Sequence, residues 1–163
     1  MKRYPALLLC LLMLLALAAC GAKQLKEPPQ LTVRGETGSV TAMVGTYSWS
    51  WQGKGLLGTN GGVNACSDHP LSCQDSLPRL EEAGAEVTLT FAVPPEKIVE
   101  VRCWSDRCWN DGSTAMAEEP EWDGSCIRLM PGGYIYQVTA TWNDVENAYS
   151  GNCDYAFYAV GAE

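Results

Sequence analysis

The chain has 163 residues and a formal net charge of −8, with 19 acidic residues against 11 Lys and Arg. This length can build one domain with a sizeable core and is short for two. An acidic chain lacks the surplus of Lys and Arg that neutralises phosphates, so nucleic acid is not expected as a partner.

The N-terminal stretch has the order of a secretory signal. Lys2 and Arg3 supply positive charge, and a Leu-rich apolar run follows over residues 6–16. This pattern predicts a signal-peptide helix, because a spanning helix would need roughly 20 apolar residues. Small residues then lead into Leu17-Ala18-Ala19-Cys20.

Those four residues match every position of the bacterial lipobox, Leu-(Ala/Ser)-(Gly/Ala)-Cys, which they resemble. The resemblance implies that residues 1–19 are a lipoprotein signal peptide that is removed. It also implies that Cys20 becomes a lipidated N-terminus at the extracytoplasmic face of the bacterial cell membrane. The alternative is an ordinary signal peptide with a chance cysteine. Loss of Lys2 and Arg3 would change the formal charge from −8 to −10.

Residues 22–30 are mostly polar, and Pro28-Pro29 favours an extended conformation within the stretch 20–30. We expect a tether here, followed by one domain over residues 31–163. The domain shows strand-like alternation of apolar and polar residues, as in Tyr47, Trp49 and Trp51. The longest predicted strand, 134–142, points its even-numbered residues into the core.

Strands are expected at 31–33, 39–44, 46–51, 86–93, 97–104, 126–130, 134–142 and 155–160. Loops are expected at 53–64, 64–78, 105–124 and 143–152, with a possible helical turn near residues 80–83. Seven to eight short strands separated by turn residues predict an all-β, antiparallel β-sandwich.

Several motifs resemble a small immunoglobulin-like domain that recurs in lipoproteins and membrane-anchored sensor-type proteins of Gram-positive, clostridia-like bacteria. The motifs are Gly45-Thr46-Tyr47-Ser48-Trp49, His69-Pro70-Leu71, Val101-x-x-Trp104-Ser105, Gly133-Tyr134-x-Tyr136-x-Val138-x-Ala140-x-Trp142 and Tyr155-Ala156-Phe157. The resemblance implies an immunoglobulin-like sandwich and carries no established activity.

Eight cysteines are present, and six of them lie in the domain: Cys66, Cys73, Cys103, Cys108, Cys126 and Cys153. An even number in an exported chain predicts up to three disulfides. Local pairing would join Cys66 to Cys73, Cys103 to Cys108 and Cys126 to Cys153. A longer-range alternative joins Cys103 to Cys126.

The single histidine, His69, lies between Cys66 and Cys73 and follows Asp68. A Cys–His nucleophile or a zinc site is conceivable, but oxidising surroundings favour a structural loop. The acidic residues of 105–124 lack the spacing of an EF-hand. We therefore expect no metal and no cofactor.

Three tryptophans, Trp104, Trp109 and Trp122, are expected in or beside loops, where indoles could stack on sugar rings or anchor a protein. The sequence favours a membrane-anchored, non-catalytic accessory or interaction module. The first alternative is a lipoprotein that binds glycan or peptidoglycan through these tryptophans. An enzyme using the His69 loop is a remote alternative.

Overall fold

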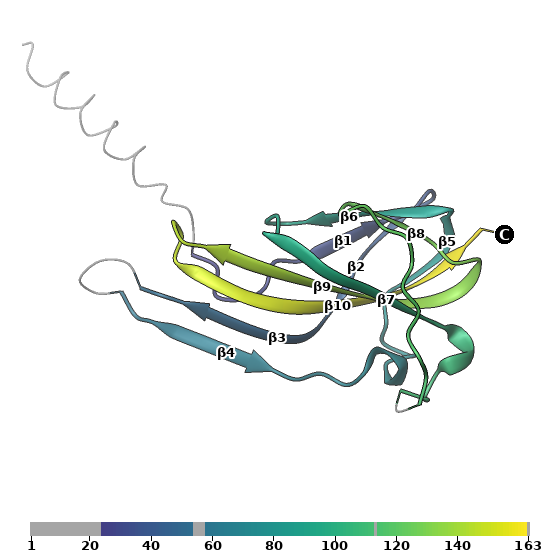
Figure 1. The fold of residues 1–163 in the computed structure, drawn as a ribbon, viewed down its shortest axis with the longest axis horizontal. Coiled ribbons are helices and arrows are strands. Elements are labelled where there is room, and N and C mark those ends of the chain that lie inside the picture. The colour runs from purple at the N-terminus through teal and green to yellow at the C-terminus, as the bar shows by residue number, and fades with distance from the viewer. Residues whose placement is uncertain (1–23, 54–57, 113, 163) are drawn as a thin grey trace, which may run out of the picture.

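Two β-sheets pack face to face as a sandwich in the computed structural model, as the alternating sequence predicts (Figure 1). The structure describes residues 24–53, 58–112 and 114–162. The expected signal peptide and Cys20 lie outside these residues. Within them, no helix combines the length and the apolar composition needed to cross a bilayer.

The smaller sheet has four antiparallel strands in the order β2-β1-β6-β8. Their bounds are β1 (Leu31–Arg34), β2 (Ser39–Thr41), β6 (Glu86–Phe91) and β8 (Cys126–Arg128).

The larger sheet has six strands, five of them in the order β4-β3-β10-β9-β7. Their bounds are β3 (Met43–Trp51), β4 (Gly61–Ala65), β5 (Arg79–Gly84), β7 (Lys97–Ser105), β9 (Gly132–Asp144) and β10 (Tyr149–Gly161). The five are antiparallel, and β5 pairs in parallel with the end of β10. Two single-turn 3₁₀ helices, η1 (Pro70–Ser72) and η2 (Asp106–Cys108), lie in the loops.

The main core lies between the sheets, where the predicted stripe of β9 is confirmed. Tyr136, Val138, Ala140 and Trp142 are buried, and Tyr134 packs against them partly exposed. Trp49 is also buried and contacts Trp142, with ring centroids 5.5 Å apart. Apolar residues at period two thus place one face of each sheet in the core.

Two strands form where the sequence predicts loops or turns. β4 falls at the end of the glycine-rich stretch and is an edge strand, where Gly61 lies close against the Trp51 ring. β5 occupies residues 79–84, where a helical turn was expected. Each has few apolar residues, and its pairing with a longer strand decides its conformation.

β10 is also longer than expected. It begins at Tyr149 rather than at residue 155, so the predicted 143–152 turn shrinks to the residues between β9 and β10. Tyr155 to Ala159 are all buried, which is typical of a central strand covered on both faces.

The predicted tether packs against the sandwich from Gln24 onward. The Tyr155 hydroxyl donates to the Pro29 carbonyl oxygen at 2.6 Å, and the Trp49 indole N–H donates to the Leu25 carbonyl oxygen at 3.1 Å. The Gln24 side-chain amide donates to the Ala148 carbonyl oxygen at 3.2 Å, beside the β9–β10 turn. Residues 24–30 therefore belong to the folded body.

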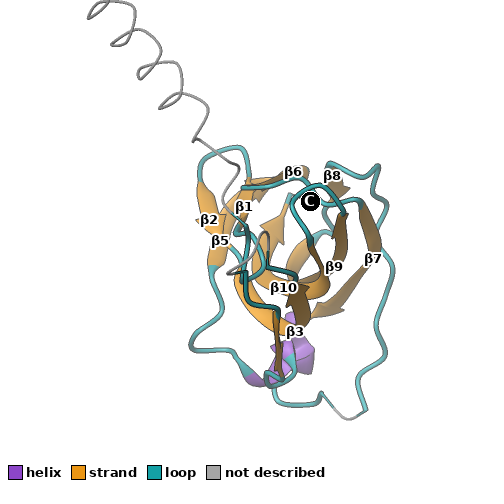
Figure 2. Ribbon diagram, turned by 90° about the vertical axis from the view of Figure 1, so that its left-hand side faces the viewer, coloured by secondary structure: helices purple, strands orange, loops and turns teal. Residues whose placement is uncertain are grey.

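A second apolar cluster lies on the outer face of the larger sheet, where the two 3₁₀ loops cover it. Figure 2 shows both short helices together on the side of this sheet that faces away from the smaller sheet. The cluster comprises Leu71, Leu77, Trp104, Ile135, Ala156 and Tyr158.

Candidate functional site

A groove of about 330 Å³ lies on the outer face of the larger sheet, beside the second apolar cluster. Its floor crosses four strands in one row, because Arg102 of β7 is paired with Gln137 of β9, Gln137 with Ala156 of β10, and Ala156 with Met43 of β3. Side chains in one such row project from the same face of the sheet. The 67–70 loop forms one wall.

The groove carries charges of both signs. Asp68 and Asp154 contribute carboxylates, and the Thr139 hydroxyl donates to Asp154 Oδ1 at 2.7 Å. Arg102 contributes a guanidinium whose Nε lies 2.7 Å from Glu100 Oε1. A polar ligand could find both hydrogen-bond donors and acceptors here.

A hydrogen bond to β3 holds the wall of the groove. The Ser67 backbone N–H donates to Thr46 Oγ1 at 3.2 Å, which ties the loop to β3. The absence of a side chain at Gly45 leaves room for the loop beside β3. A Cβ at this position would lie 3.1 Å from the Asp154 carbonyl oxygen and 3.4 Å from Ser67 Oγ.

His69 lines the groove, and its ring is already engaged. Its Nδ1 accepts a hydrogen bond from the Leu71 backbone N–H at 3.2 Å and so caps η1. The ring lies edge-on to Trp104 with centroids 5.0 Å apart. Burial lowers the pKa of His69 below its usual value, so the ring is neutral at pH 7 with its remaining proton on Nε2.

The three candidate tryptophans do not share a surface. Trp104 is buried in the second cluster, and Trp109 packs partly buried against the same cluster. Trp122 lies elsewhere, beside β8, and is 37% exposed. It borders a shallow hollow of about 360 Å³ together with Val99 and Glu119.

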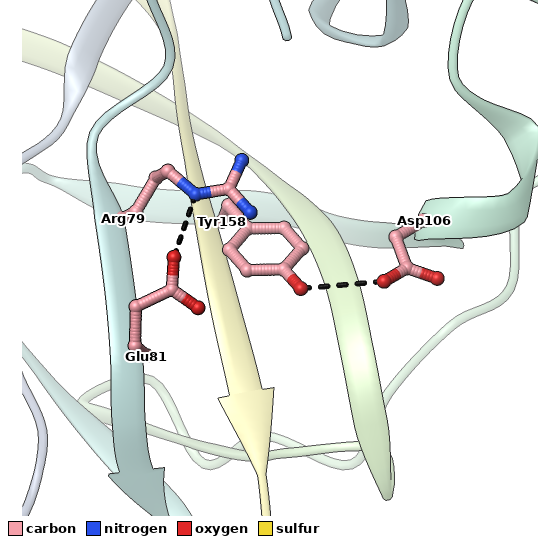
Figure 3. Close-up of polar contacts among 4 residues, drawn as sticks. All are labelled: Arg79, Glu81, Asp106 and Tyr158. Carbon is pink, nitrogen blue, oxygen red and sulfur yellow. Dashed lines mark hydrogen bonds and ion pairs between the residues drawn. The ribbon is translucent and has the colours of Figure 1, made fainter. Parts of the chain in front are cut away.

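Trp109 belongs to a stack centred on Tyr158. The two rings are stacked with centroids 6.1 Å apart, and the Arg79 guanidinium lies 3.9 Å from the centroid of the Tyr158 ring. Figure 3 shows the Tyr158 hydroxyl directed at Asp106, to which it donates at 3.3 Å, and Arg79 paired with Glu81. These contacts join η2 and β5 to β10.

All six cysteines of the described residues are free thiols in the structure, so the three local pairs are not formed. Cys103 lies in the main core, whereas Cys108 packs against the second cluster on the opposite face of the larger sheet. Cys153 is buried in the main core as well. The Cys126 thiol lies 3.8 Å from the hydroxyl of exposed Thr88, on the outer face of the smaller sheet. Both the second and third local pairs would therefore have to bridge across a sheet.

The remote Cys–His alternative finds no side-chain contact between Cys73 and His69. The Cys73 thiol donates to the His69 main-chain carbonyl oxygen at 3.6 Å rather than to the ring. Burial raises the pKa of both Cys103 and Cys153 to about 12. In the described parts of the chain, no group of three or more His, Cys, Asp or Glu side chains is arranged to hold a metal ion.

Comparison of the chain with models of protein families, with curated proteins and with solved structures finds no match. The groove residues Arg102, Gln137 and Asp154 were not identified from the sequence. These three residues are the polar residues of strands in which the neighbouring positions are apolar. This pattern predicts that their side chains lie on the outer face of a sheet, but it does not predict that they lie together.

Proposed function

We propose that this chain is a lipid-anchored, extracytoplasmic binding module that holds its ligand in the outer groove of the larger sheet and catalyses no reaction. The observation that carries this proposal is the groove itself. Four adjacent strands and one tied-down loop present charged, amide and apolar groups around a volume of about 330 Å³.

The anchoring part rests on Leu17-Ala18-Ala19-Cys20 and on the position of Gln24. Only three residues separate Cys20 from Gln24, and an extended chain spans at most 3.3–3.6 Å per residue, so Gln24 would lie within roughly 15 Å of the lipid. Two acyl chains on one glycerol would hold such a protein firmly at a membrane.

This short link would orient the domain. Gln24 contacts the Gln52 and Ala148 carbonyl groups at the β9–β10 turn end of the sandwich. Figure 1 shows the two short helices toward the other end of the molecule. The groove, which includes His69 beside η1, would therefore lie away from the anchored end of the sandwich and stay accessible.

The non-catalytic part is supported by how the reactive side chains are used. His69 Nδ1 caps η1, and the Cys73 thiol is directed at a carbonyl oxygen. A raised pKa keeps the Cys103 and Cys153 thiols protonated, and a protonated thiol is a poor nucleophile.

A photo-reactive amino acid at position 137 of the full-length, membrane-anchored chain tests the groove. We expect specific cross-links from this position in intact cells, and substitution Arg102→Ala should weaken them. The matched control is position 90, because Thr90 is exposed on a strand of the smaller sheet. Equal cross-linking from positions 137 and 90 would contradict the proposal that the ligand binds in the groove.

Glycan or peptidoglycan binding remains a second candidate, and two surface features favour it. Neutral hydroxyl and amide groups, from Ser48, Ser50, Ser150, Thr141 and Asn152, line a shallow hollow of about 370 Å³ on the same face of the larger sheet. The exposed indole of Trp122 offers a stacking surface of the kind used on sugar rings.

Sedimentation with purified peptidoglycan tests this candidate. Retention of the wild-type chain that is lost in Asn152→Ala or in Trp122→Ala would support it and would show which surface is used. Failure of the wild-type chain to sediment would rule the candidate out.

A further inference from the structure

We propose that Cys73 and Cys108 form a disulfide that locks the two 3₁₀ loops together over the outer face of the larger sheet. Each cysteine belongs to one of these loops, since Cys73 directly follows η1 and Cys108 ends η2. Both pack against the second apolar cluster. Cys73 and Cys108 are far apart in the sequence, so the pairing is not a local one.

The two loops contact each other close to both cysteines. The Asn110 backbone N–H donates to the Leu71 carbonyl oxygen at 2.9 Å. Gly112 lies against His69, where an added Cβ would be 3.0 Å from Nδ1. Cys73 is two residues from Leu71, and Cys108 is two residues from Asn110.

Disulfides span Cα separations of about 4.4–6.8 Å. Each of the two loops has its cysteine at the end of a single 3₁₀ turn, and the Asn110–Leu71 hydrogen bond already joins the loops. Closing the bond would require the Cys73 thiol to leave its contact with the His69 carbonyl oxygen.

Competing partners are less well placed. Cys103 and Cys153 are buried in the main core on the other face of the sheet, and the Cys126 thiol lies beside Thr88 on the smaller sheet. Cys66 is exposed, whereas Cys73 is partly buried against the second cluster. The proposal therefore leaves Cys66, Cys103, Cys126 and Cys153 as thiols.

The bond forms by thiol–disulfide exchange with a disulfide oxidant, for which oxidised glutathione serves as the probe. One cysteine thiolate attacks a glutathione sulfur, and one glutathione leaves as a thiolate. The second cysteine then attacks the mixed disulfide and releases the other glutathione. Two cysteine thiols thereby lose two protons and two electrons, and one oxidised glutathione becomes two reduced molecules.

Peptide mapping of the full-length exported chain tests the pairing. The chain is treated with oxidised glutathione, alkylated, digested without reduction and analysed by mass spectrometry. We expect a linked peptide pair containing Cys73 and Cys108. A link between Cys66 and Cys73 or between Cys103 and Cys108, or alkylation of both Cys73 and Cys108, would overturn the proposal.

A thermal unfolding cycle gives a second test that does not depend on mapping. Under oxidising conditions, Cys73→Ser and Cys108→Ser should each lower the melting temperature, and the double variant should lower it by no more than either alone. Cys66→Ser is the matched control and should leave the melting temperature unchanged. Additive losses from Cys73→Ser and Cys108→Ser would contradict a shared bond.

Discussion

Single side chains hold the turns of this molecule by accepting backbone hydrogen bonds. Asp144 accepts from the Asn147 backbone N–H and from its side-chain amide, both at 2.8 Å, at the start of the β9–β10 turn. Asp123 accepts from the Ser125 and Cys126 backbone N–H groups before β8. His69 does the same for η1. Asp144 and Asp123 therefore hold the turns beside β9 and β8, and His69 holds the start of η1.

The Asp144 contacts predict a pH dependence of stability. Hydrogen bonds from Asn147 lower the pKa of Asp144 below its ordinary value of 3.8. A lowered pKa in the folded state contributes stability above pH 3.8, and this contribution is lost as pH falls through the folded pKa. Urea unfolding should therefore show wild-type protein more stable than Asp144→Asn at neutral pH, with the difference in the free energy of unfolding shrinking as the pH falls below 3.8.

The matched control is Asp75→Asn, because Asp75 is exposed and accepts no hydrogen bond among the described residues. Asp75→Asn should leave the free energy of unfolding at neutral pH unchanged. If the difference in the free energy of unfolding between wild type and Asp144→Asn stays constant down to acid pH, the Asp144 carboxylate does not contribute stability in this way.

Residue types alone could locate the main core but not the second one. Trp49 and Trp142 alternate with polar residues, and their burial follows from that pattern. Trp104 directly follows buried Cys103, so two adjacent residues enter cores on opposite faces of the sheet. Nothing local in the sequence indicates that the two 3₁₀ loops cover the outer face there, so Trp104 and Trp109 were expected in or beside loops.

At the scale of elements, pairing with long strands decides which short segments become ordered. β9 and β10 pair along their whole lengths, and β3, β5 and β7 align on their outer edges. The long strands were recognisable from alternation. The short strands β4 and β5 were not, because their few apolar residues produce no clear period and their order comes from partners distant in sequence.

The N-terminal segment is a further element of this kind, and its removal should destabilise the domain. A chain beginning at Leu31 loses the hydrogen bonds of Tyr155 with Pro29 and of Trp49 with Leu25. It also exposes core surface that these residues cover. We expect its free energy of unfolding to fall by about 2–4 kcal/mol relative to a chain beginning at Gln24.

Urea unfolding followed by tryptophan fluorescence measures this loss. A chain beginning at Gly21 is the control and should match the chain beginning at Gln24. Equal midpoints for the chains beginning at Leu31 and Gln24 would show that residues 24–30 act only as a tether.

At the scale of the whole molecule, the proposed lipid anchor and the groove lie at different places on the sandwich. The N-terminal motif ending at Cys20 would fix one end of the sandwich to a membrane, because Gln24 and Leu25 pack against that end. The groove on the outer face of the larger sheet would then lie away from the anchored end. The sandwich class followed from strand periodicity, whereas the groove depends on how four strands align, which the sequence does not show locally.

Mass spectrometry of the mature N-terminus, on protein purified from the membranes of an expressing bacterium, is the decisive measurement for the proposed lipid anchor. We predict a chain that begins at Cys20 and carries a diacylglyceryl group on its sulfur. A chain recovered in the soluble fraction with an unmodified Cys20, or one cleaved at another position, would contradict it.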